Sequence, residues 1–184
     1  MKIQNLLMLF GLLSILIACD HTIEKQIYLG ADLSYVNEME DCGGNYLENG
    51  STVDPYRLFA ENGCNLVRVR LWNDPVCSGY SDYMDVEKTI RRSKEQGMEV
   101  LLDFHYSDTW ADPQHQVIPK AWKNISDLQI LGDSLYNFTF ATLMKLSDKN
   151  ILPGFVQVGN EVNIEIMQPE DSMNATVIQS ERSI

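Results

Sequence analysis

Three times along this chain, a helix-like stretch ends at a glycine and a short apolar run follows at once. The junctions read NGCNLVRV at 62–69, QGMEVLLDF at 96–104 and PGFVQVGN at 153–160. Glycine ends helices because it adopts the left-handed conformation without steric cost. Short apolar runs next to such residues are typical of buried strands. Helix and strand in alternation predict an α/β fold with a parallel sheet and right-handed crossovers.

We expect four strands and three intervening helices. The strands are predicted at residues 26–34, 65–72, 98–106 and 154–161. Asp54 followed by Pro55 is typical of a helix N-terminus, because the aspartate caps free N–H groups and the proline has none to cap. Asp85 is the expected start of the second helix, and Ser126 or Asp133 is the expected start of the third.

The net charge of the chain limits the classes of ligand that it is expected to bind. The 184 residues carry a formal net charge of −12 and are 45% hydrophobic, which suits one globular domain. Binding of nucleic acid requires a basic surface, so no nucleic acid partner is expected. The negative net charge also disfavours a strongly anionic polymer as the substrate. A neutral small molecule or a neutral glycan fits this charge better.

The N-terminal stretch MKIQNLLMLFGLLSILIAC is typical of an export signal, and its apolar run is short for a membrane span. It ends in LIAC, which resembles the lipobox of bacterial lipoproteins, where the cysteine is lipidated. We expect a signal peptide over 1–18, a lipid on Cys19, a tether over 19–26 and the domain over 27–184. The domain would then be anchored to a membrane, in the periplasm or on the cell surface. An uncleaved anchor or an ordinary secretory signal is the alternative.

Export implies an oxidising compartment, which permits disulfides. Three cysteines follow the lipobox, so at most one pair forms among them. Cys64 precedes an apolar strand and is expected to be a buried small residue. A bridge between Cys42 and Cys77 is therefore a hypothesis, because both are predicted in polar loops after strands.

Polar side chains gather at the predicted strand ends, where parallel α/β folds carry their functional groups. They are Asp32, Arg68, Arg70, Trp72, Asp103, His105, Asn160 and Glu161. No glycine-rich nucleotide motif follows the first strand, so a nucleotide-binding fold has little support.

Glu161 ends the fourth predicted strand and follows Asn160. A carboxylate there suits a general acid, and partial burial would raise its pKa so that it holds a proton near neutrality. Asn160 is suited to hydrogen-bond a sugar hydroxyl beside the reacting carbon. The alternative is a glutamate at a helix start with an asparagine cap.

Arg68 and Arg70 alternate with apolar residues, which places both guanidinium groups on one strand face. Charges facing a sheet interior need partners, and the candidates are Asp32, Asp103 and Glu161. The alternative is an ion-pair network with a structural role only.

The stretch DFHYSDTWADP after the third strand carries further candidates. His105 shares a face with Asp103, and it is suited to donate to a sugar hydroxyl or to orient a carboxylate; a satisfied core histidine is the alternative. Trp110 offers the flat apolar surface on which sugar rings stack. A metal site is disfavoured because no HxH or HExxH spacing occurs.

With these residues assembled, the chain resembles glycoside hydrolase family 53, the endo-β-1,4-galactanases of pectic arabinogalactan breakdown. The resemblance includes GADLSYVNEME, NGCNLVRVRLWNDP, EVLLDFHYSDTWADP, PKAW and VQVGNEVN. It implies a (β/α)8 barrel and a retaining mechanism with Glu161 as the acid/base. The implied substrates are neutral β-1,4-galactan and galacto-oligosaccharides. The implied substrate-binding residues are Arg68, Arg70, His105, Asp108, Trp110 and Asn160.

The sequence departs from that family in one respect. Only 23 residues follow Glu161, so strands 5 to 8 and the nucleophile of strand 7 are absent, and the chain is expected to be the N-terminal half of the barrel. Unpaired strand edges predict poor solubility or dimerisation. We expect no galactanase activity from the chain alone and no cofactor, with a calcium site in the absent half left open. The alternatives are a galactan-binding half-barrel without catalysis and a non-functional fragment.

Overall fold

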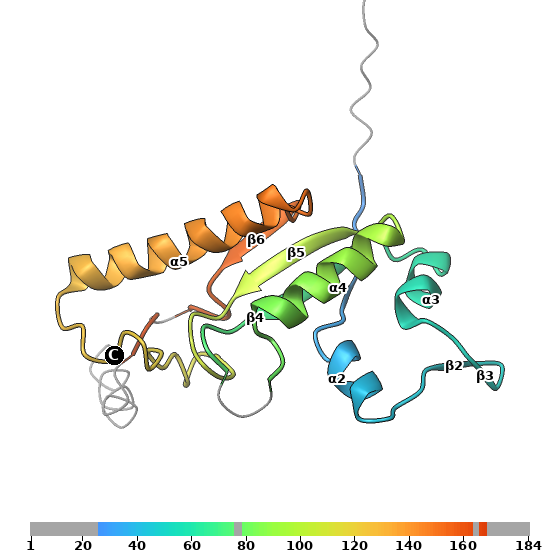
Figure 1. The fold of residues 1–184 in the computed structure, drawn as a ribbon, viewed down its shortest axis with the longest axis horizontal. Coiled ribbons are helices and arrows are strands. Elements are labelled where there is room, and N and C mark those ends of the chain that lie inside the picture. Colours follow the sequence, from blue (N-terminus) through green and yellow to red (C-terminus); the bar gives the residue numbers. More distant parts are fainter. Residues whose placement is uncertain (1–25, 76–78, 164–165, 169–184) are drawn as a thin grey trace, which may run out of the picture.

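The computed structural model describes residues 26–75, 79–163 and 166–168. Its centre is a four-stranded parallel sheet in the order β1-β4-β5-β6, and a small antiparallel hairpin, β2–β3, lies apart from it (Figure 1). Helix α3 precedes β4, α4 joins β4 to β5, and α5 joins β5 to β6. The predicted parallel sheet of βα units is therefore confirmed.

Each strand is shorter than predicted and lies inside its predicted range. The bounds are β1 Gly30–Asp32, β4 Leu66–Leu71, β5 Glu99–Phe104 and β6 Phe155–Val158. Arg68 is in register with Asp32 of β1, and Arg70 is in register with Asp103 of β5. Side chains alternate between the two faces of a sheet, so Arg68, Arg70 and Asp103 share the face opposite the helices.

Aspartates cap the three longer helices, although two of the predicted starts are wrong. Helix α3 spans Pro55–Glu61, and Asp54 caps it as predicted. Helix α4 spans Tyr83–Glu95 and begins after Asp82, whose carboxylate accepts the N–H of Asp85 at 2.8 Å. Asp85 therefore lies in the first turn and does not open the helix.

Helix α5 spans Leu128–Asp148 and is capped by Asp127, between the two predicted starts. The Asp127 carboxylate accepts the N–H groups of Gln129 and Ile130, at 2.8 and 3.1 Å. The alternating pattern gave no sign of two further elements, helix α2 at Val36–Asp41 and the hairpin strands β2 Leu47–Glu48 and β3 Ser51–Thr52.

The core lies between the sheet and the helices that cover one of its faces. The larger cluster joins β4 and β5 to α4 and α5, and it includes Val69, Leu102, Phe104, Ile90 and Leu146, which are at most 1% exposed. A smaller cluster forms around Tyr56 and Val67 where α2 and α3 approach the sheet. The strands that carry the polar groups are thus packed firmly against helices on their other face.

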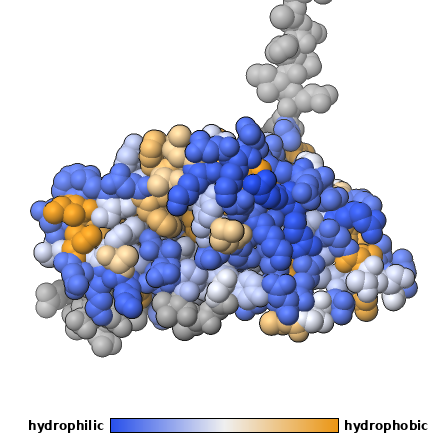
Figure 2. All heavy atoms as spheres, in the orientation of Figure 1, coloured by the Kyte–Doolittle hydropathy of each residue, from blue (hydrophilic) through white to orange (hydrophobic). Residues whose placement is uncertain are grey.

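The edge strand β6 is less covered than the adjacent strand β5. Val156 and Val158 are 39% and 57% exposed, and Tyr136 and Phe140 of α5 stack on each other while 63% and 52% exposed. Figure 2 shows apolar patches over α5 on a mostly hydrophilic face. An open apolar edge agrees with the expected tendency to associate, which stays a prediction.

Several predictions fall on residues outside the described ranges. They concern Cys19 with its lipid, Cys77, and the tail from 169 onward. Cys42 is exposed, and its pairing with Cys77 stays a prediction. Cys64 is half-buried rather than fully buried. Among the helices that the structure describes, none has the length and apolar character needed to cross a bilayer.

Candidate functional site

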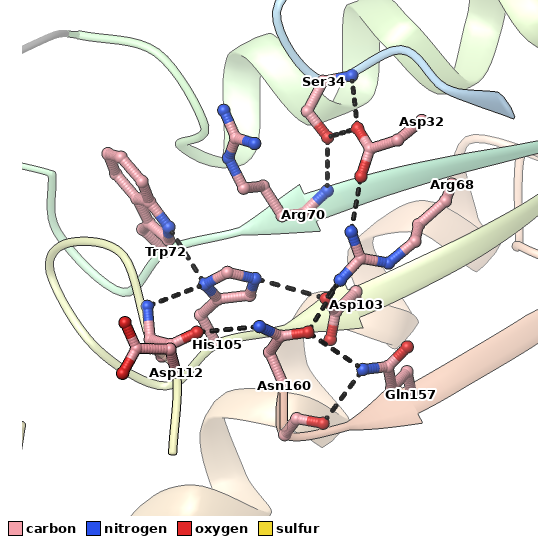
Figure 3. Close-up of polar contacts among 12 residues, drawn as sticks. Asp32, Ser34, Arg68, Arg70, Trp72, Asp103, His105, Asp112, Gln157 and Asn160 are labelled. Atoms are coloured by element: carbon pink, nitrogen blue, oxygen red, sulfur yellow. Dashed lines mark hydrogen bonds and ion pairs between the residues drawn. The ribbon is translucent and has the colours of Figure 1, made fainter. Parts of the chain in front are cut away.

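Arg68 links the C-terminal ends of three other strands. From β4, its guanidinium is ion-paired with Asp32 at the end of β1 and with Asp103 on β5. The same group donates to Oδ1 of Asn160, two residues after the end of β6, at 2.8 Å (Figure 3). Two of the three predicted acidic partners are therefore found, and Glu161 is not one of them. The planar guanidinium of Arg68, with its rigid set of N–H donors, therefore connects the C-terminal ends of all four strands.

Asp32 is held in its charged form. Its burial raises the pKa of the carboxyl, but the opposing contributions are larger. Ser34 donates to Oδ1 from its hydroxyl at 2.6 Å and from its backbone N–H at 3.0 Å, and Arg68 adds its positive charge. The pKa of Asp32 therefore lies below its ordinary value.

Asp103 and His105 form a fully buried pair beside Arg68. Nδ1 of His105 accepts the indole N–H of Trp72 and the backbone N–H of Ala111, both at 3.3 Å. Because Nδ1 accepts, the proton of the neutral ring lies on Nε2, which is 3.2 Å from Asp103 without good hydrogen-bond alignment. Of the predicted roles, this geometry favours orienting the carboxylate, since the imidazole is only 1% exposed.

Arg70 shares the strand face with Arg68 but has different surroundings. The expected carboxylate partner is not found among the described residues, although the side chain is only 2% exposed. Its guanidinium lies over three aromatic rings instead, at 3.8 Å from the centroid of Tyr35, 5.2 Å from that of Trp110 and 5.5 Å from that of Trp72. Cation–π contacts of this kind hold the charge in place of an ion pair.

Asn160 and Glu161 follow β6 and differ sharply in burial. Asn160 is 4% exposed, accepts from Arg68, and donates from Nδ2 to the carbonyl oxygen of Ala111 at 2.7 Å. Glu161 is exposed and has a left-handed backbone, with φ at 51°. The partial burial predicted for its carboxyl group is therefore wrong. This side chain is open to a ligand at the strand ends.

The loop after β5 places Asp108 and Trp110 in different roles. Both carboxylate oxygens of Asp108 accept backbone N–H groups, from Asp74 at 3.0 Å and from Lys120 at 2.7 Å, so this residue braces two loops. Trp110 is 40% exposed and lies edge-to-face against His105, with ring centroids 5.4 Å apart. Its free surface is available to an apolar sugar face.

Besides Tyr35, three residues that hydrogen-bond within the site escaped the sequence-based prediction. The Ser34 hydroxyl accepts the backbone N–H of Arg70 at 3.1 Å, and the run Asp32-Leu33-Ser34 at a strand end was the signal for it. Gln116 and Gln157 contact Asn160, and a glutamine in a loop or strand gives no comparable signal. Among the described residues, no three His, Cys, Asp or Glu side chains are placed to hold a metal ion.

Comparison with known proteins decides the family. The profile of glycosyl hydrolase family 53 matches residues 28–181. The chain belongs to glycosyl hydrolase family 53. An arabinogalactan endo-β-1,4-galactanase of Cellvibrio japonicus is 54% identical over 162 residues, which are 83% of this chain and 43% of that protein. An endo-β-1,4-galactanase of Bacillus subtilis is 42% identical over 147 residues, which are 76% of this chain and 34% of that protein.

Solved structures of family 53 proteins agree with this assignment. A fungal β-1,4-galactanase superposes with a TM-score of 0.73 at 38% identity, over 77% of this chain and 42% of that one. The family 53 catalytic domain of Ignisphaera aggregans gives 0.71 at 37% identity, over 80% and 43%. The chain thus spans less than half the length of these relatives. The predicted fold, part of a (β/α)8 barrel, is confirmed.

Proposed function

We propose that this chain supplies the galactan-binding and proton-donating half of an endo-β-1,4-galactanase site. The observation that carries the proposal is the joining of β1, β4, β5 and the end of β6 through Arg68. That network holds Asn160 rigidly and leaves the neighbouring Glu161 exposed at the same edge. Relatives named endo-β-1,4-galactanases support the substrate.

In the proposed mechanism, Glu161 protonates the leaving glycosidic oxygen and later activates water. Asn160 and His105 belong to the buried polar groups around Arg68, which form the floor of the site. Trp110 stacks against a sugar ring with its exposed face. Arg70 is buried against the rings of Tyr35 and Trp110, and we assign it to holding Trp110 in place beneath the sugar rather than to a direct sugar contact. Asp108 contributes by shaping the loop that presents Trp110.

A retaining glycosidase also needs a second carboxylate about 5 Å from the acid/base, to attack the anomeric carbon. The two carboxylates of the Arg68 network are poor candidates, because both are ion-paired and Asp103 is fully buried. We therefore propose that the attacking group is contributed from outside these 184 residues, and that the chain by itself does not cleave galactan.

The same observation supports a second candidate, a galactan-binding module without catalysis. Trp110 and Glu161 remain exposed while the acidic residues of the floor are engaged with Arg68. Binding without hydrolysis is within reach of such a surface. The two candidates share the binding residues and differ only in whether Glu161 ever transfers a proton.

Titration calorimetry with β-1,4-galactotetraose and a reducing-sugar assay on β-1,4-galactan test the proposal together. We expect binding by the wild-type chain, a loss of at least tenfold in Trp110→Ala, and no reducing sugar released. Tyr136→Ala is the matched control, because it removes an exposed aromatic ring from α5, away from the strand ends. Absence of binding in the wild-type chain would contradict the proposal, and release of reducing sugar would contradict the external nucleophile.

We also propose that the protein is an exported lipoprotein held at a membrane through Cys19. The support is the LIAC sequence after an apolar stretch. Metabolic labelling with radioactive palmitate in a bacterial host tests it. Label is expected in the wild-type protein and not in Cys19→Ala, and equal labelling of both proteins would contradict it.

A further inference from the structure

Gln116 is a buried glutamine outside the residues that the proposed mechanism uses. It lies in the loop between β5 and α5 and is only 2% exposed. Its side-chain nitrogen donates to the carbonyl oxygen of Asn160 at 2.6 Å and to that of Asp112 at 3.0 Å. One amide group therefore ties the loop after β5 to the peptide that joins Asn160 to Glu161.

The chemistry of these contacts leaves the glutamine no freedom of orientation. Both partners are backbone carbonyl oxygens, which only accept, so the –NH2 group must face them with both of its protons engaged. A carboxylate of the same shape would place negative charge against two carbonyl dipoles. An apolar side chain would leave two buried carbonyl oxygens without a donor, and each unpaired acceptor lowers the stability of the fold.

The backbone of Gln116 ties the same loop to a further segment, at Gln168. Its carbonyl oxygen accepts the N–H of Gln168 at 2.5 Å, and Val117 forms an isolated parallel bridge with Gln168. The Asn160 side chain closes the arrangement through the carbonyl oxygen of Ala111. Segments on both sides of Glu161 in the sequence are thus fastened to the loop of residues 111–118.

The conformation at Glu161 needs such support. Its φ of 51° lies in the left-handed region, and Gly159, two residues earlier, has a φ of 91°. A non-glycine residue in that region costs of the order of 1 kcal/mol and persists only where its surroundings impose it. Among the described residues, the Glu161 side chain makes no hydrogen bond or ion pair that would impose it from its own end.

We propose that Gln116 is a positioning residue, which fixes the Asn160–Glu161 peptide and so aims the Glu161 carboxyl group at the bound sugar. The expected effect on sugar binding rests on the proposed function of Glu161. The fixing of the Asn160–Glu161 peptide rests on the hydrogen bonds alone. With an exposed fraction of only 2%, Gln116 offers almost no surface to a bound sugar.

Backbone NMR of the isotopically labelled chain tests the geometric part without any sugar. Gln116→Met and Gln116→Glu are compared with Gln114→Met, a control that changes an exposed glutamine two residues away in the same loop. We expect the Asn160 and Glu161 signals to move in both Gln116 variants and to stay in place in the control. Signals of Val69 and Leu102, which report the core strands, should stay in place in all three.

Titration with β-1,4-galactotetraose then tests whether this positioning affects sugar binding. We expect about a tenfold weaker affinity in Gln116→Met and a larger loss in Gln116→Glu, with the control unchanged. Unmoved Glu161 signals in both Gln116 variants would overturn the proposal. Displaced Val69 and Leu102 signals in both would overturn it too, because Gln116 would then support the fold as a whole. If the wild-type chain binds no galactotetraose, the proposed function fails, while the NMR comparison still decides the role of Gln116.

Discussion

Strands β5 and β6 are neighbours in register, yet their side chains have different environments. On the face toward the helices, Leu102 and Phe104 of β5 are completely buried. Their register partners on β6, Val156 and Val158, are 39% and 57% exposed. Both strands are apolar, so the difference comes from their neighbours. Among the residues that the structure describes, β5 pairs with a strand on each side and β6 pairs with a strand on one side.

The candidate site spans this boundary. Asp103 and His105 come from the covered strand and are locked by Arg68, Trp72 and Ala111. Glu161 comes from the open strand and depends on contacts from the loop after β5. The Asp103–His105 pair is therefore built into the core, whereas the proposed proton donor Glu161 is positioned indirectly, through the contacts of Asn160 with Arg68 and with the loop after β5. The predictions below test this division.

The largest effect is expected for Phe104→Ala on β5. Removing a fully buried phenylalanine costs lost burial and a cavity, about 3–5 kcal/mol of the free energy of unfolding. Phe155→Ala on β6 is the matched control, because this phenylalanine is 38% exposed, and it should cost clearly less. Urea unfolding followed by circular dichroism measures both, and equal losses would refute the contrast between the strands.

Arg68→Ala should follow, with a loss of about 3 kcal/mol, because it leaves the fully buried Asp103 without its charge partner. Arg57→Ala is the control. Arg57 forms an exposed pair with Glu61 four residues on, at 2.9 Å, and such pairs contribute little. Thermal unfolding of the two variants should show a large shift for Arg68 and almost none for Arg57. Comparable shifts would mean that the Arg68 network is not part of the core.

Asp127→Ala should cost about 1 kcal/mol, since it removes the acceptor of two N–H groups at the start of α5, the helix that connects the two strands. Asp133→Ala makes a fair comparison, because within the described part of the chain its carboxylate accepts only from the side chain of Gln129 in the same helix. Denaturant midpoints of the two variants measure this. A larger loss for Asp133 would place the helix start elsewhere.

The smallest effect is expected at Asp32, where the stabilisation by the charged carboxylate is lost in acid. Its folded pKa lies below the ordinary value, so its charged form stabilises the fold above the unfolded pKa of about 3.9. That contribution is lost as the pH falls through the folded pKa. The stability difference between the wild type and Asp32→Asn should therefore shrink on acidification from about pH 5 to pH 3. A difference that grows in acid would contradict the sign of this shift.

Much of the fold followed from local sequence signals. The glycine junctions and the apolar runs predicted all four sheet strands, and Asp54 with Pro55 predicted the start of α3. Helix starts at Asp82 and Asp127 were missed because several aspartates and serines precede each helix, and capping geometry selects among them only in three dimensions. The hairpin strands have two residues each, too few for a periodic signal.

The candidate site was predicted in its residues more than in its contacts. Period two along β4 predicted that Arg68 and Arg70 share a face, but not that one is ion-paired and the other surrounded by aromatic rings. That difference depends on Tyr35 and Trp110, which come from distant loops. The burial of Glu161 was predicted wrongly, because the burial of an edge-strand terminus depends on chain segments that its own sequence does not describe.

The central claim is that the strand ends around Arg68 form a galactan-binding surface with Glu161 exposed beside it. NMR titration of the labelled chain with β-1,4-galactotetraose tests it most directly, with a β-1,4-glucan tetrasaccharide as the epimeric control. The account predicts saturable shifts at Trp110, Asn160 and Glu161, with smaller shifts at His105 and none along α4. Shifts confined to other surfaces, or equal responses to the two sugars, would contradict it.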